Sequence, residues 1–273
     1  MFFYNADTRL AASGKLDAAG SYTHLRDLGQ FGDWKQIVTL GCGTLFFYND
    51  VTGKAAWGKL DAAGAYTHIT DLPAGQPGKS WQVVPVGHGQ LFFYNKATRA
   101  GKTGVIDAAG NYATQKEYPA GHFGTWRNIV PLDNGLLFFY NDNFDGGPSQ
   151  ALSGYVDWLG HYTDLHIFPN GQFGQWWNMQ SLAGNWLNFQ GDPITQKGAT
   201  GKLDADTGLY THVKTLAQVG DWPKMVSVGG GYQLFLYRAG PPTAAASGRI
   251  DPSGDLKRIE FGSTFGQWSV IVG

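Results

Sequence analysis

The sequence repeats one unit six times. Copies of the phrase LFFYN, some of them degraded, recur every 44 to 49 residues, and they begin at Met1, Leu45, Leu91, Leu137, Trp186 and Leu234. A period of this length is typical of propellers and solenoids, in which each unit buries its apolar face against its neighbours. The copies run from end to end of the sequence. They predict a single domain over residues 1–273, with repeats starting near 1, 45, 91, 137, 186 and 234.

Each repeat contains four short apolar runs separated by Gly or Pro. In the second repeat these runs are LFFYN (45–49), AAWGKLD (55–61), YTHITDL (66–72) and WQVVPV (81–86). None has a helical period, and the composition, with 15% aromatic residues and 40 glycines, favours strands and turns. Four strands in about 45 residues make one blade of a propeller. The fold class expected is therefore all-β, a six-bladed β-propeller of four-stranded antiparallel blades.

The two ends of the sequence are complementary halves of a repeat. The sequence starts with the strand MFFYN and ends with WSVIVG, the run that precedes LFFYN in other repeats. We expect the N- and C-terminal strands to pair and close the ring, which removes two exposed sheet edges. Two tandem β-trefoils are the rival architecture, since six units divide into two sets of three. That arrangement does not require complementary ends, so the propeller is favoured.

A second phrase, GKLDAAG, occurs at 14–20 and 58–64, with weaker copies in the other four repeats. Its aspartate ends a strand and its last glycine closes a turn. Asp accepts hydrogen bonds from turn amides, and Gly adopts the left-handed conformation that such turns need. We therefore interpret six acidic residues as hairpin turns and not as catalytic groups; they are Asp17, Asp61, Asp107, Asp157, Asp204 and Asp251.

Charge and composition exclude several classes of protein. The net charge is −1, so no overall field attracts nucleic acid or an anionic membrane. The single cysteine, Cys42, excludes an internal disulfide and a cysteine-based zinc cluster. No apolar run could span a bilayer, and no signal peptide is visible, so we expect a cytoplasmic or non-classically secreted protein.

No cofactor or metal is expected. Three histidines share the position after Tyr-Thr, but they lie in separate repeats and cannot meet at one ion; they are His24, His68 and His212. They either cap outer strands or line a pocket in each blade. The segment NDNFDGG (141–147) lacks the acidic residue that completes an EF-hand and is interpreted as a turn-rich loop.

The loops before the repeated tryptophans suit a repeated weak binding site. They read GQFGDW, GHFGTW and GQFGQW, and an indole can stack on the apolar face of a sugar while amides bind its hydroxyls. The alternative is that each Trp only packs one blade on the next. The candidate ligand-binding residues are Trp34, Trp81, Trp126, Trp176, Trp222, Trp268, Gln30, Asp33, Gln172, Gln175, Gln267, Asn5, Asn49, Asn95 and Asn141.

One residue in the fifth repeat breaks the pattern. Asn188 occupies a strand expected to be buried, at the position aligned with Phe47, Phe93 and Phe139. A buried amide needs hydrogen-bond partners, so Asn188 implies local repacking, a bound water molecule or a specialised fifth blade.

The order of motifs in FGTWRNIVPLDNGLLFFYN (123–141) resembles the repeat of tachylectin-2-type propeller lectins. The resemblance spans all six repeats, although that family has five blades and carries Asn-Trp where this sequence reads YTHL. It implies a multivalent lectin without catalysis, which holds N-acetylated sugars between neighbouring blades and has glycans or glycoconjugates as partners. The alternative is a protein-interaction scaffold that does not bind sugar, and a glycoside-processing enzyme is a third possibility.

Overall fold

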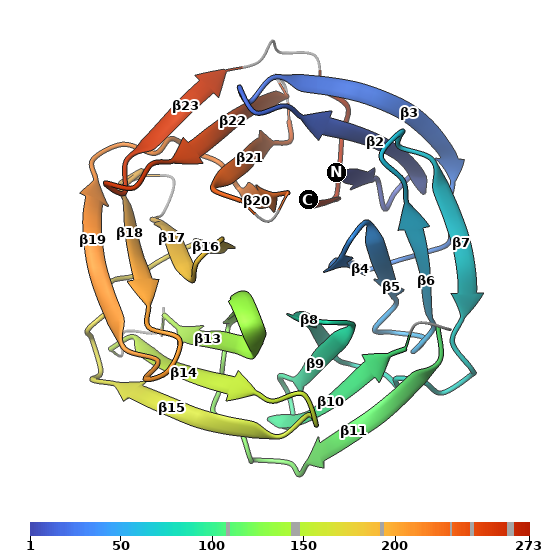
Figure 1. Ribbon diagram of the computed structural model, residues 1–273, viewed down its shortest axis with the longest axis horizontal. Coiled ribbons are helices and arrows are strands. Elements are labelled where there is room, and N and C mark those ends of the chain that lie inside the picture. The colour runs from blue at the N-terminus through green and yellow to red at the C-terminus, as the bar shows by residue number, and fades with distance from the viewer. Residues whose placement is uncertain (108–109, 143–147, 192–193, 230, 241–242, 261–264) are drawn as a thin grey trace.

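The computed structural model describes residues 1–107, 110–142, 148–191, 194–229, 231–240, 243–260 and 265–273. Six four-stranded antiparallel sheets stand as blades around a central axis, and Figure 1 shows them as a closed ring. The only helix in the described ranges is a single 3₁₀ turn, η1 (Asp133–Gly135). The prediction of an all-β, six-bladed propeller is confirmed.

Each blade contributes one strand to each of four concentric layers. The innermost strands are β24 (Val270–Val272), β4 (Gln36–Gly41), β8 (Gln82–Gly87), β12 (Asn128–Pro131), β16 (Asn178–Leu182) and β20 (Lys224–Val228). The second layer is β1 (Phe2–Tyr4), β5 (Thr44–Tyr48), β9 (Gln90–Asn95), β13 (Leu136–Asn141), β17 (Trp186–Gln190) and β21 (Gln233–Arg238). The third is β2 (Leu10–Leu16), β6 (Ala55–Leu60), β10 (Ala100–Ile106), β14 (Gln150–Val156), β18 (Gly198–Leu203) and β22 (Ala244–Ile250). The outermost is β3 (Tyr22–Gln30), β7 (Tyr66–Asp71), β11 (Tyr112–Tyr118), β15 (Tyr162–Phe168), β19 (Tyr210–Leu216) and β23 (Leu256–Glu260).

The ring closes through its two ends. In blade one, β1 pairs with β2 on one side and with β24 on the other, so that Phe3 lies opposite both Ala12 and Ile271. This pairing confirms the predicted closure. The repeat seen in the sequence is offset from the blade by one strand, because β8, which ends the second sequence repeat, belongs to blade three together with β9, β10 and β11.

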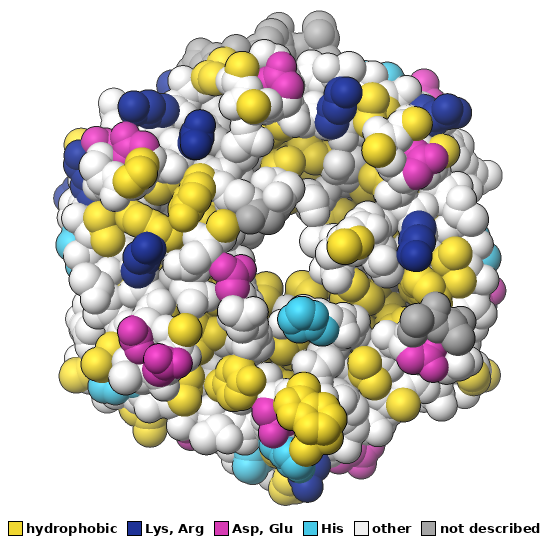
Figure 2. Space-filling view, viewed as in Figure 1, with side chains coloured by type: hydrophobic (Ala, Val, Ile, Leu, Met, Phe, Trp, Pro, Cys, Tyr) yellow, Lys and Arg dark blue, Asp and Glu magenta, His cyan; other side chains and the backbone are white. Residues whose placement is uncertain are grey.

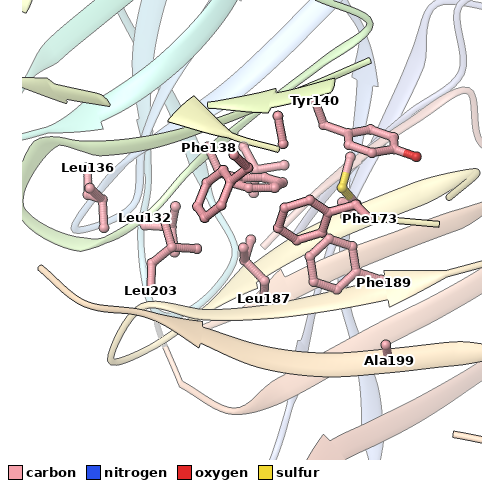
Figure 3. Packing of buried hydrophobic residues seen from close by; sticks show 13 residues of the cluster. Leu132, Leu136, Phe138, Tyr140, Phe173, Leu187, Phe189, Ala199 and Leu203 are labelled. Atoms are coloured by element: carbon pink, nitrogen blue, oxygen red, sulfur yellow. The ribbon is translucent and has the colours of Figure 1, made fainter. Parts of the chain in front are cut away.

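The second-layer strands are buried on both faces, as their continuous apolar runs predict. Phe46 and Phe47 are adjacent in β5, and each is at most 1% exposed. Adjacent residues of a strand point to opposite faces, so the two rings pack into the interfaces on either side of the blade. Six separate clusters of buried residues result, one for each interface between blades. Figure 3 shows the cluster between blades four and five, in which Phe138 and Phe173 lie close to Phe189.

The repeated phrase GKLDAAG forms a turn and also joins neighbouring blades. The carboxylate of Asp17 accepts a hydrogen bond from Ser21 N at 2.8 Å, as the hairpin interpretation predicts. The closing glycine Gly64 has φ +80°, and its carbonyl accepts a 2.8 Å hydrogen bond from the buried hydroxyl of Ser13 in the preceding blade. Equivalent bonds join blades three and four, four and five, and five and six; they run from Thr103 to Gly160, Ser153 to Gly208 and Thr200 to Gly254.

The ring has two distinct faces. The face that carries these turns, together with the hairpins between first- and second-layer strands, is called the turn face. The opposite face carries the Trp-containing loops and is called the loop face. Figure 2 shows that the centre of the ring is open. No helix in the described segments is long and apolar enough to cross a membrane.

The three histidines after Tyr-Thr lie on outermost strands and are exposed, and two of them contact an aspartate three residues on: His24 lies 3.3 Å from Asp27 and His68 lies 3.7 Å from Asp71. The described residues contain no group of three His, Cys, Asp or Glu side chains that could hold a metal ion. Residues 143–147 of the segment NDNFDGG lie outside the described residues.

Candidate functional site

In five of the six blades a buried tyrosine at the end of the second-layer strand holds the Trp-containing loop that leads from its blade to the next. The hydroxyl of Tyr94 donates a 2.7 Å hydrogen bond to Gly124 O and accepts a 3.1 Å hydrogen bond from Trp126 N. The same pair of bonds is made by Tyr4, Tyr48, Tyr140 and Tyr237. The loop backbone is therefore fixed by the core of the blade, and the repeated FGxW motif has a structural role.

Replacing Tyr94 with Phe removes both hydrogen bonds and leaves the buried N–H of Trp126 and the carbonyl of Gly124 without this partner. We expect the free energy of unfolding to fall by about 1–3 kcal/mol. Chemical denaturation of the wild type and of Tyr94→Phe measures this loss. A matched change at Tyr155, an exposed tyrosine, should have little effect. Equal losses at the two positions would contradict the role assigned to Tyr94.

Stability at high pH follows from the same tyrosines. Burial raises the pKa of Tyr48 to about 12 and that of Tyr140 to about 12, although the hydrogen bonds from Trp81 and Trp176 partly oppose the shift. Tyrosine in an unfolded chain ionises near pH 10. Between about pH 10 and 12 the unfolded chain binds fewer protons than the folded protein, so the free energy of unfolding falls as pH rises. Thermal melts should give a constant Tm from about pH 7 to 9 and a steep fall above about pH 10; a Tm unchanged at pH 12 would contradict this.

The predicted tryptophans pack against the blades to different extents. Trp126 and Trp222 are buried, whereas Trp34, Trp81, Trp176 and Trp268 are half-buried against interface clusters. The predicted loop polar residues are more open: Gln30, Gln172, Gln175 and Gln267 are exposed, and Asp33 forms a 2.9 Å ion pair with Lys35. The six loops lie at six different junctions between neighbouring blades, so the structure brings these residues together only around one junction at a time.

Three of the predicted asparagines order the turn that follows them. The side-chain oxygen of Asn95 accepts hydrogen bonds from Ala97 N and Thr98 N, and Asn5 and Asn49 do the same in their blades. Asn141, at the end of β13, is half-buried. Asn often forms turns of this kind, because its side chain hydrogen-bonds to backbone amides two or three residues on.

The sequence alignment of the fifth repeat was wrong by one residue. In β17 it is Phe189 that lies opposite Met179, as Phe47 lies opposite Ile37 in blade two. Asn188 therefore replaces Phe46, not Phe47, and Gln190 occupies the place of the loop-holding tyrosine. Gln190 Nε2 accordingly donates a 2.9 Å hydrogen bond to Gly220 O. Asn188 is buried, and its Nδ2 contacts Met225 Sδ at 3.5 Å.

A cavity with a volume of about 670 Å³ lies on the loop face between blades two and three. Its wall includes Trp81 and Asn95, two of the predicted site residues, together with Gln36 and Gln82 at the starts of innermost strands. Gln36 bridges the two blades, since its Nε2 donates to Trp81 O at 2.7 Å and its Oε1 accepts from Val83 N at 2.8 Å. Gln82 Oε1 is buried without a hydrogen-bond partner in the described structure. The cavity therefore offers an indole wall and an unused amide acceptor.

Two groups of opposite charge line this cavity, Asp50 from blade two and Lys96 from blade three. They occupy the same position in their repeats, directly after Asn49 and Asn95. Partial burial of the ammonium, together with the nearby Arg127, lowers the pKa of Lys96, and the ammonium donates a 3.1 Å hydrogen bond to Arg127 O. A carboxylate and an ammonium of lowered pKa facing one cavity can accept and donate protons in the same reaction.

Sequence reasoning missed a buried lysine behind this cavity. Lys102 is only 8% exposed, and its Nζ lies 5.0 Å from the ring centroid of Trp81 and donates to Pro77 O. The equivalent residues opposite Phe3 and Phe47 are Ala12 and Ala56. A lysine at a strand position that holds alanine in blades one and two was a signal visible in the sequence. Burial lowers the pKa of Lys102.

No protein-family model matches the sequence, and no curated protein is similar to it. Solved structures match nearly the whole chain. A protein from Lactobacillus plantarum is 15% identical with a TM-score of 0.59, and the match covers 98% of this chain and 81% of that one. A candidate 6-phosphogluconolactonase from Bacteroides fragilis is 15% identical with a TM-score of 0.55, over 96% and 84% of the two chains. The periplasmic gluconolactonase of Pseudomonas aeruginosa is 15% identical with a TM-score of 0.55, over 96% and 95%.

These comparisons overturn the prediction of a tachylectin-2-like multivalent lectin. The similar structures whose names state a function are lactonases and a streptogramin B lyase, and the lectin family finds no support among them. The error arose because the LFFYN strand forms the core and its tyrosine holds the FGxW loop. Both motifs therefore indicate a propeller blade and neither indicates a ligand. The same names are at odds with the prediction that the protein is not an enzyme. At 15% identity the likeness shows the fold alone, a β-propeller that covers nearly the whole of this chain.

Proposed function

We propose that the protein is a hydrolase that opens a small lactone in the cavity between blades two and three. The observation that carries the proposal is that Asp50 and Lys96 face one cavity of about 670 Å³ beside the indole of Trp81. That volume is in the range of small-molecule sites, roughly 300–1,000 Å³. The gluconolactonases among the similar structures support the reaction class by analogy of fold.

The chemistry needs one base and one acid. Asp50 accepts a proton from a water molecule as its oxygen attacks the lactone carbonyl, and the C–O bond of the ring breaks when the tetrahedral intermediate collapses. Lys96 donates a proton to the departing ring oxygen, and its lowered pKa makes it a readier donor than an ordinary lysine. The product is the open hydroxy acid, and solvent returns both groups to their starting protonation states.

The other cavity residues position the substrate. The indole of Trp81 provides a flat apolar wall for one face of the ring. The Oε1 of Gln82 is buried without a partner, so the side chain must turn toward the cavity to accept a hydrogen bond from a substrate hydroxyl. Lys102, beneath Trp81, keeps that indole in place and contributes no atom to the cavity wall.

The test is the hydrolysis of D-glucono-1,5-lactone followed by acid release, with the spontaneous rate subtracted. We expect the wild type to exceed the spontaneous rate, and Asp50→Asn to lose about 100-fold or more in kcat, the usual contribution of a general base. Lys96→Met should lower kcat and remove the basic limb of the pH profile. Asp7→Asn, an exposed acid in a turn of the same face, is the matched control and should keep full activity.

Two results would exclude the proposal. One is a folded wild type that hydrolyses neither this lactone nor its 6-phosphate faster than buffer does. The other is an active wild type whose Asp50→Asn variant retains the full rate, which would place the reaction elsewhere on the ring.

A further inference from the structure

A second cavity, of about 360 Å³, lies on the turn face between blades three and four. We call it the Trp158 pocket. Val86, Val105 and Val156 supply its apolar wall, and the rings of Tyr155, Trp158 and His88 border it. Trp158 is 78% exposed, an unusual position for the largest side chain.

The fold does not require an indole at position 158. The turn that carries it is DWLG (157–160), and the corresponding turns of blades one and two are DAAG with Ala18 and Ala62. Gln90 Nε2 anchors the turn through Asp157 O at 3.0 Å and Trp158 O at 3.1 Å. Gln233 anchors Asp17 O and Ala18 O in the same way, where the side chain is a methyl group. The indole is therefore an addition to a turn that is already complete without it, held on a fixed backbone.

The same two blades lack a cation that the other four carry. At the end of the third-layer strand the residue is Lys15, Lys59, Lys202 or Arg249 in blades one, two, five and six. In blades three and four it is Val105 and Tyr155, and both line the Trp158 pocket. In blade five the lysine serves as a cation for an indole of this face, since Lys202 Nζ lies 5.1 Å from the ring centroid of Trp186. In the Trp158 pocket, Val105 and Tyr155 stand at the positions of this internal cation, and the rings of Tyr155 and Trp158 have no such cation from their own blades.

The surrounding sequence is acidic. Residues 128–196 contain no Lys or Arg and six aspartates, which are Asp133, Asp142, Asp145, Asp157, Asp164 and Asp192. Asp133 and Asp157 belong to turn-face segments of blade four. Burial opposes ionisation of Asp157, but the hydrogen bonds from His161 and Leu159 outweigh it and hold the pKa of Asp157 below its usual value. On the face in Figure 2, dark blue side chains are sparse in the lower part of the ring, where β9–β10 and β13–β15 lie in Figure 1.

We propose that the Trp158 pocket binds a small organic ammonium ion, with the cation against the faces of Trp158 and Tyr155. Aromatic faces attract cations most strongly when the cation is poorly hydrated, as a methylated ammonium is. The aspartates raise the local concentration of cations, and the absence of Lys and Arg over residues 128–196 removes the competing charge. The valine wall contacts the methyl groups. This site is on the opposite face from the lactone cavity and stands independently of it.

The experiment titrates the full chain with choline, by calorimetry and by indole fluorescence. We expect saturable binding of about one equivalent, weakened by added salt. The uncharged isostere 3,3-dimethyl-1-butanol should bind at least about threefold more weakly, since it has the same shape without the charge. Equal affinity for the two compounds would overturn the proposal, and so would no binding of choline by the folded protein.

Three variants locate the site. Trp158→Ala restores the DAAG pattern, so it should fold normally and lose about 3- to 30-fold in affinity for choline. Trp177→Ala removes another exposed tryptophan, on the loop face, and should bind as the wild type does. Val105→Lys reinstates the cation of the other blades and should abolish binding by occupying the ring and repelling the ligand. Unchanged affinity in both Trp158→Ala and Val105→Lys would show that choline binds elsewhere and would overturn the proposal.

Discussion

Deleting residues 1–5 should abolish the folded state. The deletion removes β1, the strand that pairs with both β2 and β24, and it exposes two edges of the ring. It also removes Phe2, Phe3 and Tyr4, each at most 1% exposed. Truncating one buried aromatic side chain costs about 3–5 kcal/mol. Three such losses approach or exceed the entire stability of an ordinary domain, about 5–15 kcal/mol. We expect aggregation on expression and no cooperative thermal transition.

A circular permutant separates the loss of the strand from the change of chain end. Joining Gly273 to Met1 through a short glycine-rich linker and opening the chain at the exposed Gly75 keeps every strand and every pair. This permutant should melt cooperatively within several degrees of the wild type. A five-residue deletion that melts normally, or a permutant that aggregates as the deletion does, would contradict the role assigned to ring closure.

Replacing Gly64 with Ala should destabilise the protein by about 3 kcal/mol. The φ of +80° costs a non-glycine residue on the order of 1 kcal/mol. An added Cβ would also lie 2.7 Å from Leu25 Cβ and closer still to Ser13 Oγ, in the interface between blades one and two. The neighbouring blade must move, which weakens the hydrogen bond from Ser13 to Gly64 O. For a chain of this size we expect a fall in Tm of roughly 6–12 °C.

Gly75→Ala is the matched control for the steric part of this effect. Its φ is +86°, similar to that of Gly64, but a Cβ there would meet no atom within 4 Å. It should cost only the backbone term, about 1 kcal/mol. Differential scanning calorimetry of both variants gives the difference directly. Equal shifts in Tm would mean that contact between blades adds nothing to the strain of the turn.

The architecture could be predicted because each strand and turn motif occurs in six copies, some of them degraded. A single LFFYN or DAAG is weak, but the period near 45 residues and the complementary ends fix the number of blades and the closure. The turn role of Asp17 was likewise predictable, since Asp and Gly have backbone preferences that hold locally. The sequence of one repeat does not show which atoms of the next repeat it contacts. The bond from Ser13 to Gly64 therefore emerged only from the structure.

The site was harder to predict for the same reason. Asp50 and Lys96 each read as an ordinary turn residue after an asparagine, and only the packing of two blades makes them face one cavity. The spacing of the tryptophans does not decide their role, because an indole that packs a blade and an indole that binds a ligand have the same spacing. In blade five the degraded phrase WLNFQ (186–190) corresponds to TLFFY (44–48) and not to LFFYN (45–49), so the alignment from sequence was one residue out of register. Gln190 was consequently not recognised as the substitute for a tyrosine.

The six separate interface clusters have a consequence for how this protein can diverge. Substitutions in clusters that share no residues should add in free energy, because sites far apart with no common partner are energetically independent. A destabilising substitution in one interface can therefore be compensated only by a second substitution in the same interface. Lys102 between blades two and three and Asn188 in blade five are departures confined in this way. A ring of this kind can acquire a different chemistry in each gap between blades while the remaining gaps keep the original packing.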